Sequence, residues 1–155
     1  LMFKQELPLM FPHDEDVRRV ADAFYDPFEY LWERHRAGVF NTAFAKPLGK
    51  ISYQVPCHLR VQNIGLKTRD VLELCPETQV EPIERCSGHD GTYGVKSRFR
   101  EASLRIAKPV MRRVAESGCD VFTSDCPMAG AQIVGGVDGV AYSHPLTLLR
   151  HAYGI

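Results

Sequence analysis

Three of the five cysteines each follow a short run of residues that is typical of a β-strand. Cys57, Cys86 and Cys126 stand just beyond these runs. If the runs are parallel strands of one sheet, the three thiols gather beyond the carboxyl ends of the strands, where open α/β sheets bind ligands. Three converging thiols favour a metal, an iron–sulfur cluster or a redox centre over chance burial.

The pattern from Gly49 onward alternates between strand and helix. Strands are predicted at 50–55, 79–84, 120–124 and 139–142, and helices at 59–74, at 94–117, after Pro127 and from Pro145. Repeated βα units imply a parallel sheet with right-handed crossovers. We therefore expect an α/β fold with a parallel sheet of about four strands and helices on both faces.

Residues 1–48 are expected to form a separate helical segment that precedes an α/β domain at 49–155. Asp14 is a suitable N-cap for a helix at 15–25, and the pair Asp26-Pro27 is a further helix start. The sequence therefore predicts N-terminal helices followed by one α/β domain.

The predicted fourth strand brings a histidine to the same edge of the sheet. His144 follows that strand, while His58 and His89 stand close to Cys57 and Cys86. Zinc takes four thiolate or imidazole ligands, and iron–sulfur clusters usually take four thiolates. Three cysteines and one histidine satisfy zinc, and a cluster with one ligand other than cysteine is the other option. The two remaining cysteines, Cys75 and Cys119, are interpreted as structural.

The spacing of the cysteines matches no short metal-binding motif. Between Cys57 and Cys86 there are 28 residues, between Cys86 and Cys126 there are 39, and the chain has no C-x-x-C pair. The prediction of a metal site therefore depends on where the loops lie in the fold.

Composition limits the class of protein. The chain has 155 residues, 45% of them hydrophobic and 25% charged, which fits one globular domain. Its 19 basic and 19 acidic residues give no net charge, which argues against a nucleic-acid partner. No apolar run approaches the ~18 residues that cross a bilayer. Five scattered cysteines fit a reducing compartment, so we expect a cytoplasmic protein.

Four segments together resemble the cysteine-rich CCG domain that occurs in heterodisulfide reductase (its B subunit) and in anaerobic glycerol-3-phosphate dehydrogenase (its C subunit). These segments are YQVPCHLR at 53–60, RCSGHDGTYG at 85–94, SDCP at 124–127 and SHPLTLL at 143–149. The motifs occur in the family's order. Residues 1–8 resemble the helix after a preceding repeat, so we expect the chain to be the second of two repeats.

The resemblance implies an iron–sulfur cluster, of the 4Fe-4S type, bound by Cys57, Cys86 and Cys126. The family has Cys-Cys-Gly and C-x-x-C where this chain has CSG at 86–88 and CPMA at 126–129. Ser87 therefore stands at a ligand position, and His89 or His144 is expected to supply a further ligand. Zinc is the alternative metal.

The resemblance also implies a function. It predicts an electron-transfer module of a multi-subunit oxidoreductase, a redox relay rather than a catalytic component. Its expected partner is a flavoprotein or ferredoxin-like subunit, through which it associates with the inner face of the membrane. The alternative is a zinc-binding or metal-free structural domain that docks partner subunits.

Overall fold

The computed structural model of this chain describes residues 1–91 and 93–155, and Thr92 of the predicted Gly-rich loop lies outside the described residues. The strands are β1 (Gly49–Gln54), β2 (Thr78–Ile83) and β3 (Val121–Thr123). The helices are η1 (Met2–Glu6), α1 (Leu7–Met10), α2 (Glu15–Ala23), α3 (Pro27–Arg36), α4 (Cys57–Gln62), α5 (Lys67–Leu72), η2 (Ser97–Phe99), α6 (Arg100–Glu116), α7 (Pro127–Val134) and α8 (Pro145–Ala152).

The strands form one parallel sheet in the order β2-β1-β3. Ile51 at the centre of β1 lies opposite Val80 of β2 and Val121 of β3. The chain moves from β1 to β2 in one direction and then returns across β1 to β3. The carboxyl ends of β1 and β3 therefore flank a point where the strand order reverses, the usual ligand position in such sheets. The predicted α/β class is confirmed.

The expected fourth strand is reduced to a single bridge. Tyr142 pairs with Phe122 of β3, and the backbone N–H of Ser143 donates to the carbonyl of Phe122 at 3.1 Å. Gly139 has a φ of +74°, which turns the chain just before this contact. Pro145 then begins α8, so the segment leaves the sheet after one pair. The sheet therefore has three strands among the described residues, not about four.

Two predicted helices have different bounds in the structure. The expected helix at 59–74 is divided into α4 and α5, because Asn63 and Gly65 have φ angles of +54° and +79°. The long helix expected from residue 94 begins at Arg100, after turns and the short η2. Left-handed residues end a helix, which explains the division.

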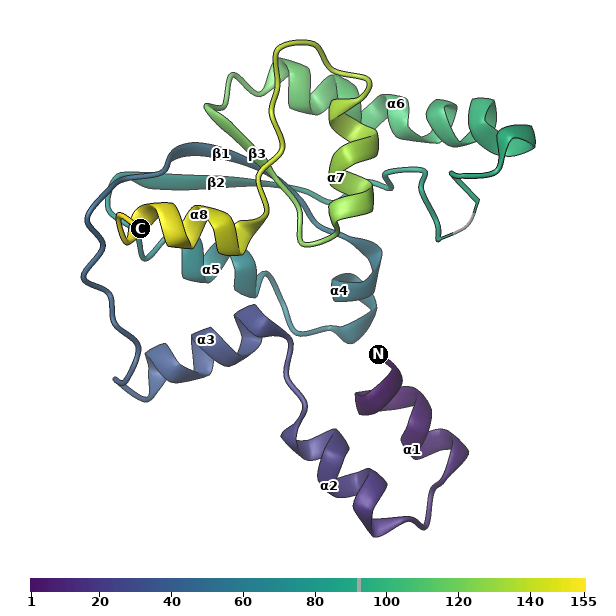
Figure 1. The fold of residues 1–155 in the computed structure, drawn as a ribbon, viewed down its shortest axis with the longest axis vertical. Coiled ribbons are helices and arrows are strands. Elements are labelled where there is room, and N and C mark those ends of the chain that lie inside the picture. The colour runs from purple at the N-terminus through teal and green to yellow at the C-terminus, as the bar shows by residue number, and fades with distance from the viewer. Residues whose placement is uncertain (92) are drawn as a thin grey trace.

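Each face of the sheet has its own hydrophobic core (Figure 1). On one face α3, α5 and α8 cover Ile51, Tyr53 and Val80, with Phe28 of α3 buried in the same cluster. On the other face α6 and α7 cover Phe122 of β3. Helices thus cover both faces, as the sequence predicted. Helix α3, which precedes the domain boundary predicted at 48/49, packs in the first of these cores. The boundary itself stays a prediction.

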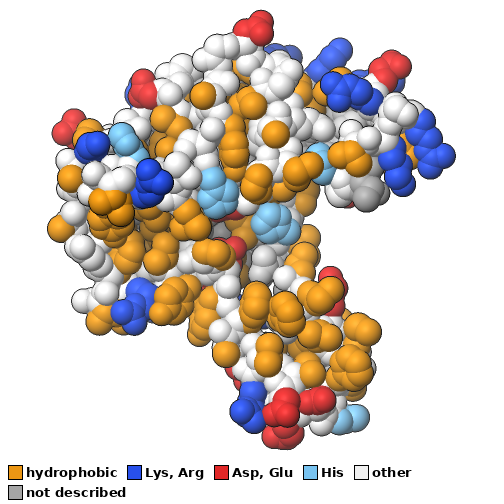
Figure 2. All heavy atoms as spheres, viewed as in Figure 1, with side chains coloured by type: hydrophobic (Ala, Val, Ile, Leu, Met, Phe, Trp, Pro, Cys, Tyr) orange, Lys and Arg blue, Asp and Glu red, His pale blue; other side chains and the backbone are white. Residues whose placement is uncertain are grey.

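Helices η1, α1 and α2 form a lobe beside the sheet (Figure 1). Asp14 caps α2, and a capping box of Asp26 and Glu29 begins α3. Lys4 of η1 contacts Glu29 at 2.9 Å and so ties the lobe to α3. Figure 2 shows hydrophobic side chains gathered on this lobe and Lys and Arg side chains at the projecting end of α6. None of the described helices is long and apolar enough to cross a membrane.

Candidate metal centre

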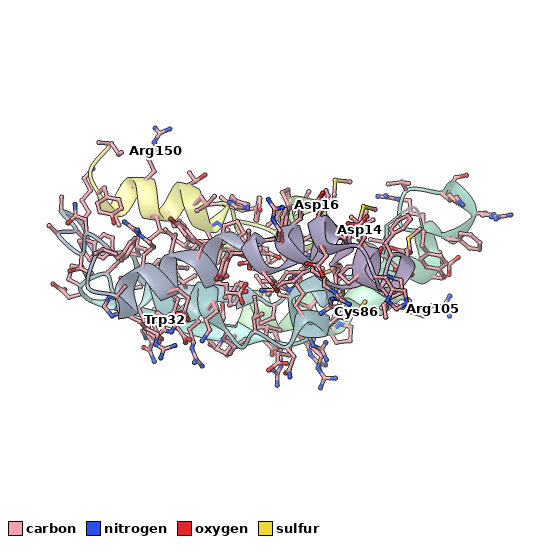
Figure 3. All side chains as sticks on the ribbon, turned by 90° about the horizontal axis from the view of Figure 1, so that it is seen from below. Asp14, Asp16, Trp32, Cys86, Arg105 and Arg150 are labelled. Carbon is pink, nitrogen blue, oxygen red and sulfur yellow. The ribbon has the colours of Figure 1, made fainter. Side chains whose placement is uncertain are left out.

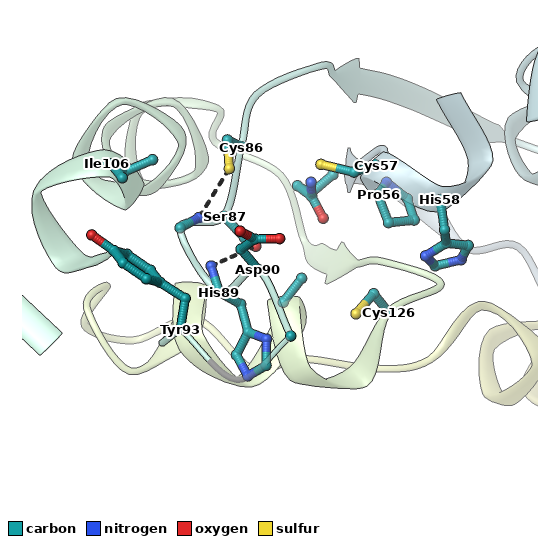
Figure 4. Close-up of a pocket in the computed structure, with 14 residues that line it drawn as sticks. Pro56, Cys57, His58, Cys86, Ser87, His89, Asp90, Tyr93, Ile106 and Cys126 are labelled. Carbon is teal, nitrogen blue, oxygen red and sulfur yellow. Dashed lines mark hydrogen bonds between the residues drawn. The ribbon is translucent and has the colours of Figure 1, made fainter. Parts of the chain in front are cut away.

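A pocket of about 420 Å³ opens beyond the carboxyl ends of the strands, and three cysteines line it. Cys57, Cys86 and Cys126 come from the loops after β1, β2 and β3, and Figure 4 shows them around the same opening. Seen from below in Figure 3, Cys86 lies toward the opposite end of the molecule from Trp32. The structure thus brings the three predicted cysteines to one pocket.

Local structure positions each cysteine in a different way. Cys57 is the first residue of α4, and Cys126 is the N-cap of α7. Cys86 lies in the loop after β2, where its Sγ accepts a hydrogen bond from the backbone N–H of Gly88 at 3.3 Å. The backbone N–H of Cys126 donates to Ser124 Oγ at 3.3 Å. All three positions are therefore held by backbone geometry at the ends of strands.

The thiols of Cys57 and Cys86 line the same pocket. Partial burial raises the pKa of Cys57 above its usual value, and the neighbouring Cys86 raises it further. Arg60 opposes both effects. Because metal ligands must be thiolates, a bound metal ion or cluster would have to displace this proton.

The loop that carries Cys86 is held from behind by α6 and α7. Ser103 Oγ donates to the carbonyl of Gly88 at 2.6 Å, and Gln132 Nε2 donates to the carbonyl of Ser87 at 2.7 Å. Gly88 has a φ of +75°, and a Cβ there would lie 2.2 Å from the backbone oxygen of Ser103. The motif therefore needs glycine at position 88. The Oγ of Ser87 accepts from His89 N at 3.4 Å, so this hydroxyl serves the loop itself.

The three candidate histidines have different places. His58 and His89 line the pocket, whereas His144 does not. His144 is the N-cap of α8, where its Nδ1 accepts from Leu146 N at 3.3 Å. The Nε2 of His89 is buried and has no hydrogen-bond partner among the described residues. In Figure 4, however, its ring points away from the sulfurs of Cys86 and Cys57.

A half-buried carboxylate, Asp125, lies directly before Cys126. Asp125 accepts hydrogen bonds from Tyr53 Oη at 2.6 Å and from Thr68 Oγ1 at 2.9 Å. Burial raises the pKa of Asp125. The two hydrogen bonds and the nearby His144 lower this pKa and so offset part of the rise. Burial and the Asp125 carboxylate also raise the pKa of Tyr53. The hydrogen bonds from Tyr53 and Thr68 connect the end of β3 to β1 and α5.

The donor atoms fit an iron–sulfur cluster better than a single ion. Across residues 1–91 and 93–155, no three His, Cys, Asp or Glu side chains lie close enough to hold one metal ion. Zinc requires its donors at about 2.0–2.3 Å from one centre. A cluster spreads its cysteine ligands over several irons, so it spans thiols that stand further apart. Soft thiolates such as these three are suitable ligands both for zinc and for an iron–sulfur cluster.

The two cysteines interpreted as structural lie elsewhere. Cys75 is 3% exposed and belongs to the core beneath α5 and α8. Burial raises the pKa of Cys75 to about 11, so it stays a thiol. Cys119 precedes β3 and therefore lies toward the opposite edge of the sheet from Cys126. Neither lines the cysteine pocket.

Sequence reasoning missed four polar residues that hold the cysteine loops: Gln54, Ser103, Ser124 and Gln132. A weak signal existed for one of them. Ser103 shares the buried face of α6 with Ala107, Val110 and Val114, where an apolar residue is expected. A serine on such a face indicates a hydrogen bond across the packing interface.

No family model matches the chain. The chain is similar to the C subunit of anaerobic glycerol-3-phosphate dehydrogenase from Escherichia coli strain K12, with 33% identity over 125 residues. The same protein of Escherichia coli O157:H7 matches equally. These alignments cover 79% of this chain but 31% of the relatives, so the chain spans about a third of their length.

Proposed function

Because the chain is homologous to part of the C subunit of anaerobic glycerol-3-phosphate dehydrogenase, we propose that it is an electron-transfer module of that type of oxidoreductase. Of the two kinds of enzyme that its motifs resemble, both relatives described above are of this one. The proposed cofactor is an iron–sulfur cluster of the 4Fe-4S type.

The observation that carries the proposal is the common pocket of Cys57, Cys86 and Cys126 at the point where the strand order reverses. A cluster there would accept and release single electrons, and the protein would set its position and potential. The three thiolates would hold the cluster. Gly88 N–H, which donates to Cys86 Sγ at 3.3 Å, would orient one sulfur.

Apolar side chains form part of the pocket wall, which also includes the carboxylate of Asp90. Ile106 and Ala129 line it beside the cysteines, and Ala129 is buried. Apolar walls limit the access of water, and solvent exposure is one of the factors that set a cluster's potential. Among the candidates for a fourth ligand, His89 is favoured over His144 because His89 lines the pocket.

We also propose the partners and the location that follow from this function. A flavoprotein or ferredoxin-like subunit would exchange electrons with the cluster. The module would be cytoplasmic and would reach the inner face of the membrane through such a partner. It would relay electrons and would not itself transform a substrate.

The second candidate function is a zinc-binding or metal-free domain that docks partner subunits. Its metal-free form is favoured by the absence, within the described part of the chain, of three donors close enough for one ion, an observation that counts against zinc. Anaerobic purification followed by analysis of iron, acid-labile sulfide and zinc separates the possibilities. Iron with sulfide in equal amounts and a brown colour are expected. Zinc alone, or no metal after reconstitution with ferrous iron and sulfide, would overturn the cluster.

A further inference from the structure

Gln54 is a buried polar side chain at the end of the central strand. It is the last residue of β1 and is 1% exposed. A glutamine out of contact with water is stable only when its amide is hydrogen-bonded. Its side chain points to the same face of the sheet as Ser52, two residues earlier, and it forms part of the pocket that the cysteines line.

The hydrogen bonds of Gln54 reach all three strand ends. Its Nε2 donates to the carbonyl of Val55 at 2.9 Å and to the carbonyl of Arg85 at 3.0 Å. Its Oε1 accepts from Ser124 Oγ at 2.8 Å. Val55 lies two residues before Cys57, Arg85 directly before Cys86, and Ser124 two residues before Cys126.

Ser124 extends the same network to the third cysteine. Its Oγ accepts from the backbone N–H of Cys126 at 3.3 Å, while it donates to Gln54. The sheet's own hydrogen bonds extend as far as Val55 N, which donates to the carbonyl of Ile83 at 3.1 Å. Beyond that point the amide of Gln54 links the end of β1 to the chain after β2 and to the chain after β3.

We propose that Gln54 is a positioning residue that sets the relative places of Cys57, Cys86 and Cys126, and that the site takes up its cofactor only with this network intact. The part of the proposal that concerns the cofactor rests on the proposed function. The part that concerns the cysteines does not, because it can be measured on metal-free protein.

Two variants break the network at different bonds. Gln54→Met keeps the length of the side chain but leaves the carbonyls of Val55 and Arg85 without their donor. Ser124→Ala removes the bond to Gln54 Oε1 and the acceptor for Cys126 N. Ser103 and Gln132 hold Gly88 and Ser87 from the other side of the loop, so we expect both variants to fold.

The matched control is Ser52→Ala. Ser52 is on the same strand and the same face as Gln54 and is also 1% exposed. Its Oγ has no hydrogen-bond partner within the described residues. Removing this hydroxyl therefore changes a buried polar atom beside Gln54 without touching the network.

The first measurement uses metal-free protein and diamide as the oxidant. Diamide takes two electrons and two protons from the thiols of Cys57 and Cys86, which line the same pocket and join in a disulfide. We expect the rate of this reaction, followed by peptide mapping, to fall about tenfold in Gln54→Met. That factor corresponds to about 1.4 kcal/mol, the size of one lost buried hydrogen bond. The control Ser52→Ala should react at the unaltered rate.

The second measurement is anaerobic reconstitution with ferrous iron and sulfide. Gln54→Met and Ser124→Ala should each lose most bound iron and sulfide and change the visible spectrum, whereas Ser52→Ala should match the unaltered chain. Far-ultraviolet circular dichroism checks that every variant is folded.

The outcomes separate the two proposals. If the unaltered chain takes up no cluster but Gln54→Met still slows the disulfide, the proposed function fails and the role of Gln54 stands. If folded Gln54→Met and Ser124→Ala form the disulfide and load the cluster like the control, the role of Gln54 is overturned. If Ser52→Ala has the same losses, the effect belongs to core packing and the positioning role is likewise overturned.

Discussion

Replacing Gly88 by alanine should displace the loop that carries Cys86. Gly88 has a φ of +75°, and a Cβ would lie 2.2 Å from the backbone oxygen of Ser103. A backbone oxygen inside helix α6 has little freedom to move, so the loop must shift instead. The shift would break the hydrogen bond from Ser103 Oγ to the carbonyl of Gly88, which is 2.6 Å long.

The size of the effect follows from two contributions. A residue other than glycine in the left-handed region costs about 1–2 kcal/mol. Breaking the hydrogen bond between the buried Ser103 hydroxyl and the Gly88 carbonyl costs about 1–3 kcal/mol. We therefore expect Gly88→Ala to lower the free energy of unfolding by about 3 kcal/mol and to reduce the iron bound after reconstitution.

Gly38→Ala is the matched control for backbone strain. Gly38 has a similar φ of +71°, but a Cβ there has no described atom within 4 Å. This variant should lose only the first contribution, about 1–2 kcal/mol, and keep its bound iron. Urea unfolding of both variants measures the difference. Equal losses of stability, or full iron content in Gly88→Ala, would refute the steric argument.

Four further variants test other parts of the structure. Cys126→Ser should remove most bound iron, whereas Cys119→Ser should not, and equal losses in metal analysis would show that the cysteines are wrongly divided. The unfolded thiol of Cys75 ionises near 9.0 and the folded one at about 11. The stability that this thiol contributes is therefore fully present below pH 9. As the pH rises to 11, the free energy of unfolding should fall by up to about 2.7 kcal/mol. Urea unfolding across this range should show that fall, and Cys75→Val should lack it. Tyr53→Phe removes the 2.6 Å bond to Asp125 and should lower the unfolding free energy by about 1–3 kcal/mol; an unchanged urea midpoint would contradict it.

Local sequence patterns predicted the alternation of strands and helices because they depend on neighbouring residues. The three strands and the start of α8 at Pro145 lie within one or two residues of their predicted bounds. The same patterns failed where tertiary contacts decide. The segment at 139–142 reads as a strand, but it meets β3 only through Tyr142. Residues 59–74 read as one helix, but left-handed Asn63 and Gly65 divide it.

The cysteines of the candidate site were also accessible from the sequence, because each follows a strand. Parallel strands of one sheet end at one edge, so residue order alone predicted their common pocket. The place of His144 was not predictable in this way. The residue follows the bridge at Tyr142 as expected, yet its imidazole caps α8 and does not line the pocket. The choice between a cap and a ligand depends on the direction in which the helix leaves the sheet.

The sequence by itself determined the fold class and the set of thiols, because both follow from periodicity and from positions at strand ends. Only the tertiary structure showed how those thiols are held. No local pattern marks the roles of Gln54, Ser124 and Gln132, and each has a hydrogen-bond partner 31 to 70 residues away along the chain. Hydrogen bonds over such separations arise only when the strands and helices have packed, so no local pattern reveals them.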